Sequence, residues 1–224
     1  LTLSEPAITQ TVATDVIEQM GAVAAYFGRK VLREVDEAEL LRALPELRRA
    51  AGDRAVLHLE PGLAFGSGTH DTTRLCLESL EKYAHEGKSI LDVGCGSGIL
   101  SIAGLLLGAD SAVGVDIDAL AVKTAQENGR TNGFDEPKFT VLKGSLTDKV
   151  TGKFDIIVAN IVADIIIVLC RDVKKYLNDG GVFITSGIIE PREQDVLAAF
   201  AENGIEVVER HESGGWLCFE ARVK

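Results

Sequence analysis

The stretch LDVGCGSG, from Leu91 to Gly98, decides the fold of this chain. Apolar residues lead into three glycines, Gly94, Gly96 and Gly98, which let the backbone turn sharply and come close to a ligand. A dinucleotide-binding loop has the spacing G-x-G-x-x-G, and here Ile99 stands where that pattern needs its third glycine. The stretch therefore predicts a strand that ends in a ligand-binding loop, with a poor match to a pyrophosphate.

Apolar runs and helical patterns alternate along the chain from this loop onward. We expect strands at residues 89–93, 112–115, 138–142, 154–159 and 182–186, and helices at 98–107, 119–131, 163–177 and 191–203. Residues 178–181, Asn-Asp-Gly-Gly, should end the third of these helices. The segments 205–210 and 216–223 read as a hairpin joined through Ser213-Gly214-Gly215, which should add an antiparallel strand. The alternation predicts an α/β, doubly wound, mostly parallel sheet that binds ligands at the carboxyl ends of its strands.

The first 51 residues have a different character. Ile8, Val12, Val16 and Met20 recur at every fourth position, and a second helical pattern covers residues 36–50. We therefore predict two parts, an N-terminal helical segment at 1–51 that serves as a lid or linker, and a catalytic domain at 52–224.

The charge balance narrows the range of partners. The chain carries a formal net charge of −11 over 224 residues. An acidic protein lacks the broad positive field that attracts nucleic acid, so we expect no direct nucleic-acid binding. The charge suits a cationic partner, although it also serves solubility alone.

Cysteine spacing and hydropathy indicate a cytoplasmic protein without a metal centre. None of the four cysteines belongs to a C-x-x-C pair, so a zinc or redox motif has no support. The most apolar stretch, residues 156–170, is interrupted by Asn160 and Asp164 and is too short to span a bilayer. We therefore expect no bound metal and no membrane contact.

Two polar residues follow the predicted strands at their carboxyl ends. Asp116 closes the stretch VGVD, 22 residues beyond Gly94, where a carboxylate can accept hydrogen bonds from both ribose hydroxyls of an adenosine. Taken alone it would be a solvated strand-end aspartate, but the glycine loop favours the first interpretation. Asn160 stands at the tip of the stretch VAN and is either a turn former or a polar group of the site.

Several longer motifs carry a family resemblance. LEPGLAFGSGTHDTTRLCLESL, ILDVGCGSGILSIAG, FDIIVANIVADIII and GWLCFEAR closely resemble the PrmA-type methyltransferases of large-subunit ribosomal protein eleven, which are class I S-adenosylmethionine-dependent enzymes. The resemblance covers residues 59–224. It implies a seven-stranded Rossmann-like methyltransferase sheet and N-methylation of lysine and terminal amino groups of a ribosomal protein.

The resemblance also implies a set of site residues. The loop Pro61 to Thr73 would form a wall over the methionine end of the cofactor, and Asn160 would orient the acceptor amine as the catalytic residue. Ser145 stands where relatives often have an acid near the adenine. The residues implied to bind S-adenosyl-L-methionine are Thr69, Thr73, Gly94, Gly96, Asp116 and Asn160.

Other interpretations remain open at this point. The enzyme could instead methylate a small molecule beneath a helical lid formed by residues 1–51. The chain could also be a cofactor-binding module of a larger polypeptide, which its start at Leu1 rather than Met suggests. We expect His70 to have a structural role and Trp216 to lie in the core. The pattern does not predict the oligomeric state.

Overall fold

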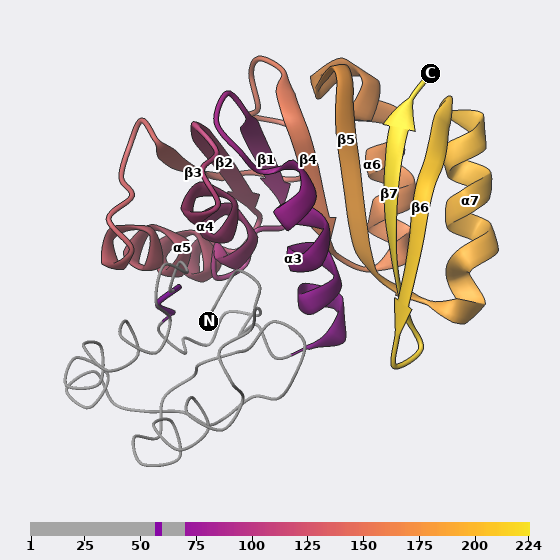
Figure 1. Ribbon diagram of the computed structural model, residues 1–224, viewed down its shortest axis with the longest axis horizontal. Coiled ribbons are helices and arrows are strands. Elements are labelled where there is room, and N and C mark those ends of the chain that lie inside the picture. The colour runs from indigo at the N-terminus through magenta and orange to yellow at the C-terminus, as the bar shows by residue number, and fades with distance from the viewer. Residues whose placement is uncertain (1–56, 60–69) are drawn as a thin grey trace.

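A computed structural model describes residues 57–59 and 70–224 of the chain (Figure 1). The predicted helical segment at 1–51 lies outside the described residues. The strands are β1 (Ser89–Val93), β2 (Ser111–Asp116), β3 (Phe139–Lys143), β4 (Phe154–Asn160), β5 (Leu177–Ile189), β6 (Ile205–Ser213) and β7 (Trp216–Val223). The helices are α3 (Asp71–Tyr83), α4 (Ile99–Leu106), α5 (Ala119–Thr131), α6 (Ala163–Tyr176) and α7 (Glu193–Glu202), and a 3-10 turn, η1 (Glu190–Arg192), precedes α7.

The described strands form one seven-stranded sheet in the order β3-β2-β1-β4-β5-β7-β6. Neighbours are parallel from β3 through β5, whereas β7 runs antiparallel to both β5 and β6. The predicted α/β sheet with its antiparallel hairpin is confirmed. The strand order reverses between β1 and β4, which makes their carboxyl ends the switch point at which such sheets bind ligands.

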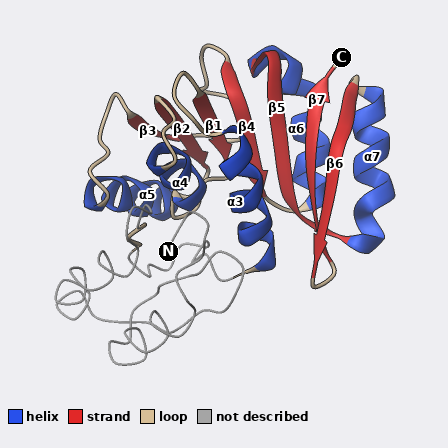
Figure 2. Cartoon of the chain, viewed as in Figure 1, coloured by secondary structure: helices blue, strands red, loops and turns tan. Residues whose placement is uncertain are grey.

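Helices cover both faces of the sheet, as expected for a doubly wound fold (Figure 2). Helices α3, α4 and α5 bury one apolar core, which includes Leu80 and Ile102. Helices α6 and α7 bury a second core on the opposite face, which includes Leu169 and Phe200. Because strand residues alternate between these two cores, the central strands are apolar throughout rather than at every second position.

Three elements differ from the sequence-based expectation. Helix α3 was not predicted, because its glycine-rich approach reads as a loop. Strand β5 begins at Leu177 directly after α6, so residues 178–181 belong to the strand and do not form a connecting loop. Leu177 pairs with Phe154, and Asn178 Nδ2 donates to Asp155 Oδ1 at 3.2 Å, which extends the pairing beyond the bulge in this ladder. The helix expected at 191–203 is divided into η1 and α7.

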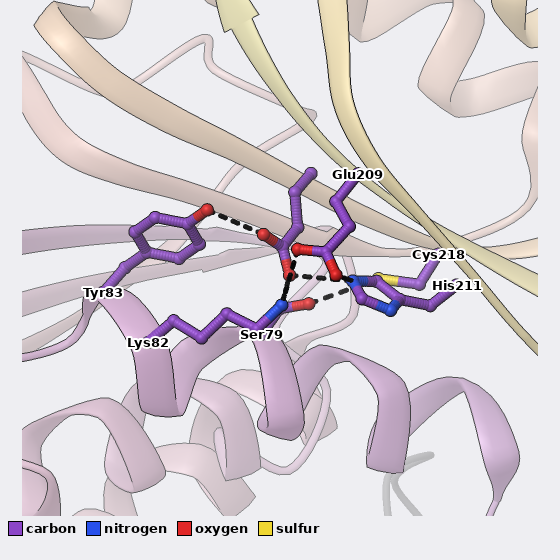
Figure 3. Close-up of polar contacts among 7 residues, drawn as sticks. Ser79, Lys82, Tyr83, Glu209, His211 and Cys218 are labelled. Carbon is purple, nitrogen blue, oxygen red and sulfur yellow. Dashed lines mark hydrogen bonds and ion pairs between the residues drawn. The ribbon is translucent and has the colours of Figure 1, made fainter.

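The last turn of α3 is fastened to the hairpin by a buried carboxylate. Glu220 on β7 has no exposed surface and accepts hydrogen bonds from Lys82 Nζ at 2.8 Å and Tyr83 OH at 2.7 Å. Figure 3 shows Lys82 reaching from the helix toward Glu209 of the hairpin, with His211 beside that glutamate. The ligand atoms of Glu209, His211 and Glu220 lie within 4.8 Å of one another, as in a metal site, but Lys82 Nζ lies 2.8 Å from both glutamates and supplies the cation.

The four cysteines are free and buried. In the part of the chain that the structure describes, no helix combines the length and the apolar character needed to cross a bilayer.

Candidate ligand-binding site

A cavity of about 770 Å³ lies at the carboxyl ends of β1, β2 and β4. Its size falls within the range of about 300–1,000 Å³ that small-molecule sites occupy. The position of the cavity coincides with the switch point between β1 and β4. Its lining includes His70, Thr73, Asp92, Gly94, Gly96, Asp116, Ile117, Ser145, Leu146, Asn160, Ile165, Val168, Gly187 and Trp216.

The glycine loop forms one wall of the cavity. Gly94 adopts a φ of +74° and donates its N–H to Val115 O at 2.8 Å, which folds the loop back over β2. A Cβ at Gly94 would lie 2.5 Å from Ile161 Cγ2, so a larger residue would force the two loops apart. The backbone is thereby exposed to a ligand at the point where side chains would obstruct it.

Asp116 is held in place by two backbone donors. Gly96 N donates to Oδ2 and Asp118 N donates to Oδ1, each at 2.9 Å. Because each carboxylate oxygen has two lone pairs, both oxygens can accept a further hydrogen bond. The arrangement suits a ligand with two neighbouring hydroxyls.

Asp92 carries a buried carboxyl group beneath the loop, with 1% of its surface exposed. Ser101 donates to Oδ2 from its backbone nitrogen at 3.1 Å and from its hydroxyl at 2.8 Å. Burial raises the pKa of Asp92 to about 7, and the charge of Asp116 adds to this, although the hydrogen bonds from Ser101 oppose it. Within residues 57–59 and 70–224, no donor reaches Oδ1. An unpaired buried carboxylate oxygen in a cavity wall suits a positively charged ligand group.

The opposite wall joins β4, α3 and β7. Asn160 Nδ2 donates to Thr73 Oγ1 at 3.2 Å, which leaves the amide oxygen as the acceptor that Asn160 can offer to a ligand. His70 caps α3, because its Nδ1 accepts from Thr72 N, and its ring meets Trp216 edge-on at 4.9 Å between centroids. The expected structural role of His70 agrees with this capping. Trp216 is half-buried and lines the cavity, so its expected place in the core was wrong.

Five of the six residues implied to bind a cofactor line this one cavity, namely Thr73, Gly94, Gly96, Asp116 and Asn160. Thr69 lies outside the described residues, as does most of the loop that was expected to cover the cofactor. Ser145 also lines the cavity. Sequence reasoning missed the apolar lining from Ile117, Leu146, Ile165 and Val168. The available signal was that Ile117 and Leu146 follow the ends of β2 and β3, and that Ile165 and Val168 lie on α6, the helix that follows β4.

Comparison with known proteins gives a consistent family. The family model described as "Ribosomal protein L11 methyltransferase (PrmA)" matches residues 38–224. A ribosomal protein L11 methyltransferase of Clostridium botulinum (strain Eklund 17B / Type B) is 50% identical over 172 residues, which cover 77% of this chain and 54% of that protein. The chain thus spans about half the length of the curated relatives it matches.

Solved structures agree with the sequence relatives. The ribosomal protein L11 methylase from Lactobacillus delbrueckii subsp. bulgaricus has a TM-score of 0.72 at 37% identity, covering 77% of this chain and 87% of that one. The 16S rRNA N2 G1207 methyltransferase (RsmC) of T. Thermophilus, in complex with AdoMet and guanosine, has a TM-score of 0.61 at 24% identity and covers 77% of this chain and 48% of that one. At that identity the second match shows the fold alone.

Proposed function

The chain belongs to the ribosomal protein L11 methyltransferase (PrmA) family, and on that premise we propose that it transfers methyl groups from S-adenosylmethionine to amino groups of a protein. Ribosomal protein L11 is the first candidate acceptor. The observation that carries the proposal is the pairing of two walls in one cavity, with the glycine loop and Asp116 on one side and Asn160 on the other.

The residues present suit the proposed cofactor. When bound, S-adenosylmethionine supplies a methyl group on a positively charged sulfur. Asp116 would hold the ribose hydroxyls, while Gly94 and Gly96 allow the close backbone approach that this requires. The unpaired Oδ1 of Asp92 would offer a buried acceptor to a cationic ligand group, and the hydroxyl of Ser145 would be available to the base.

The amine acceptor requires a neutral partner. A free lysine has a pKa of about 10.4 and is mostly charged at neutral pH, so it must lose a proton before its lone pair can attack. Apolar surroundings and a nearby positive charge lower that pKa. The Asn160 amide oxygen can accept one N–H of the amine without the charge that would stabilise the ammonium form. Alignment of the reacting groups can contribute roughly 7–11 kcal/mol of barrier reduction in favourable cases.

The acceptor side of the cavity would be bounded by Trp216, His70 and Asn160. An aromatic face accepts both the aliphatic stem of a lysine and a cationic amine. The net charge of −11 suits a basic protein acceptor and offers no broad attraction to nucleic acid. Because the proposed substrate is a ribosomal protein, we also propose that the enzyme acts in the cytoplasm.

We keep the two-part organisation as a proposal. Residues 52–224 would form the catalytic domain, and residues 1–51 would control acceptor choice as a lid or linker. The proposal rests on the positions of the implied cofactor residues, all of which lie between Thr69 and Asn160. Deleting residues 1–50 should then change acceptor use and leave cofactor affinity intact.

Two measurements test the function. Calorimetry with S-adenosylmethionine and with NAD should give binding of the first and none of the second, because Ile99 breaks the dinucleotide spacing. Transfer of labelled methyl groups to purified ribosomal protein L11 should exceed transfer to free lysine and other small amines. Binding of NAD alone would overturn the cofactor assignment, and preference for a small amine would overturn the protein acceptor.

A further inference from the structure

Arg74 links the first turn of α3 to the turn of the β6–β7 hairpin. Its Nη2 donates both to Asp71 Oδ1 at 3.2 Å and to the hydroxyl of Ser213, while its Nη1 donates to Glu78 Oε1 at 2.7 Å. Ser213 Oγ in turn donates to Asp71 Oδ1 at 2.9 Å. Arg74, Asp71 and Ser213 thus form a closed triangle of hydrogen bonds between a helix and a strand that are 139 residues apart in sequence.

The turn of the β6–β7 hairpin packs closely against this triangle. Gly214 has a φ of +59°, and a Cβ there would lie 2.6 Å from Asp71 Oδ2. The hydrogen bond from Ser213, followed by that from Arg74, lowers the pKa of Asp71, so the carboxylate is ionised at neutral pH. The contact is therefore both close and charge-assisted, which favours one fixed position of the turn.

The position of the turn determines the position of Trp216. Ser213 and Trp216 are the last pair of the β6–β7 ladder, so a shift of Ser213 moves Trp216 with it. Trp216 lies edge-on to His70, the residue that precedes α3 and caps it. Both aromatic rings line the cavity, whereas Arg74 and Ser213 are not among its lining residues. The triangle therefore supports the aromatic wall from behind.

We propose that Arg74 is a positioning residue for the acceptor side of the cavity, which acts through Ser213 and Asp71 to hold Trp216 against His70. The assignment of this wall to the acceptor rests on the proposed function. Arginine suits the role because its planar fork donates to three oxygens at once, whereas lysine presents a single ammonium group. Asp92 and Asp116 lie on the β1 and β2 side of the cavity, so the hold of these two carboxylates on the cofactor should not depend on Arg74.

The test uses the full chain and three variants. Arg74→Ala and Ser213→Ala each break the triangle, the second without removing a charge. Arg130→Ala is the matched control, because Arg130 also pairs with a carboxylate, Asp135, but lies at the end of α5 outside the cavity lining. Trp216 is the single tryptophan of the chain, so intrinsic fluorescence reports on the wall directly.

The first readout needs no turnover. Arg74→Ala and Ser213→Ala should make Trp216 more accessible to acrylamide and shift its emission to longer wavelength, while Arg130→Ala should match wild type. Calorimetry should give an affinity for S-adenosylmethionine within about twofold of wild type in all three, because none of the three variants removes a residue that lines the cavity. The double variant Arg74→Ala/Ser213→Ala should change the Trp216 fluorescence no more than the single variant with the larger effect. Both substitutions act on the same hydrogen-bonded triangle, so their effects should not add.

The second readout separates the acceptor from the cofactor. The KM for ribosomal protein L11 is measured with S-adenosylmethionine as the methyl donor. Arg74→Ala and Ser213→Ala should each have a KM about 5- to 10-fold above that of wild type, and Arg130→Ala should have the wild-type KM. An unchanged Trp216 signal in folded Ser213→Ala overturns the positioning role, as does an altered signal with an unchanged KM. If the wild type binds S-adenosylmethionine but does not methylate L11, the proposed acceptor fails, and the fluorescence still decides whether Arg74 positions Trp216.

Discussion

The side-chain amide of Asn160 donates from Nδ2 to Thr73 Oγ1 at 3.2 Å, across 87 residues of sequence. This bond joins the tip of β4 to the first turn of α3, and Thr73 itself is only 1% exposed. The amide is therefore oriented from the protein side, with its oxygen as the acceptor offered to the cavity. A catalytic role for Asn160 as a neutral acceptor depends on this orientation.

Replacing Asn160 with Asp should separate catalysis from binding. A carboxylate favours the protonated ammonium, which has no lone pair, so turnover should fall about 100-fold, roughly 2.7 kcal/mol of barrier. The affinity for S-adenosylmethionine should change by less than about tenfold, because a negative charge does not repel a sulfonium. Steady-state rates with ribosomal protein L11, together with calorimetry, give both quantities.

Raising the pH supplies an internal check on the same variant. Rates across about pH 7 to 10 should recover part of the loss, because more of the amine is then neutral. Asn203→Asp is the control, since Asn203 lies at the end of α7 and its amide donates to Ala199 O outside the cavity. Near wild-type turnover of Asn160→Asp at neutral pH would remove Asn160 from the mechanism.

Asp116→Ala should weaken cofactor binding by about 1–3 kcal/mol, since charge-assisted hydrogen bonds to a ligand diol are lost. Calorimetry with S-adenosylmethionine measures the effect. Asp110→Ala is a suitable control, because Asp110 also accepts from a backbone amide, Gly87 N at 3.0 Å, and lies away from the cavity. If Asp116→Ala binds as tightly as wild type, the ribose is held elsewhere.

Asp92 should make cofactor affinity depend on pH. Its pKa of about 7 means that a cationic ligand must displace a proton below neutrality, so affinity should rise by up to about tenfold per pH unit toward pH 7 and then level off. Among the residues that the structure describes, Asp116, Cys76 and Cys95 are the other titratable groups near this carboxyl. Asp92→Asn should bind with little pH dependence, as calorimetry from about pH 5.5 to 8.5 would measure.

The free enzyme provides the matching control. Because the folded-state pKa of Asp92 is raised from 3.8 to about 7, the folded protein binds the extra proton between these values, and its stability falls as pH rises through that window. Urea unfolding of Asp92→Asn without cofactor should lack this component. Equal pH profiles for both proteins would show that Asp92 stays ionised throughout.

Glu220→Gln should destabilise the fold without affecting the site. Burial alone would raise the pKa of Glu220, but hydrogen bonds from Lys82, Tyr83 and His211 outweigh it and lower the pKa to about 2. A depressed pKa means that this stabilisation is present above the unfolded value of 4.5 and is lost as pH falls toward 2. The variant should lose about 1–3 kcal/mol in urea unfolding at pH 7.

Glu206→Gln is the surface counterpart for this experiment. Glu206 pairs with Lys224 at 3.4 Å and both side chains are well exposed, so its loss should cost less than about 1 kcal/mol. Wild-type stability of Glu220→Gln at neutral pH would contradict the assignment of this carboxylate as the anchor of α3.

The sequence by itself determined the features that arise within short segments. The glycine loop at Gly94 to Gly98 follows β1 directly, and Asp116 and Asn160 are the last residues of β2 and β4, so local patterns located them. The alternation of strands and helices also predicted the doubly wound sheet, because each unit carries its own period and its own turn residues.

Only the tertiary structure decided which distant segments meet. The contact of Trp216 with His70, the triangle of Arg74, Asp71 and Ser213, and the burial of Glu220 all join α3 to the terminal hairpin. None of these contacts has a local signature, because the register of β7 against β5 and the docking of α3 depend on how whole surfaces pack. For this reason Trp216 was expected in the core, whereas packing of the hairpin against α3 places it in the wall of the cavity.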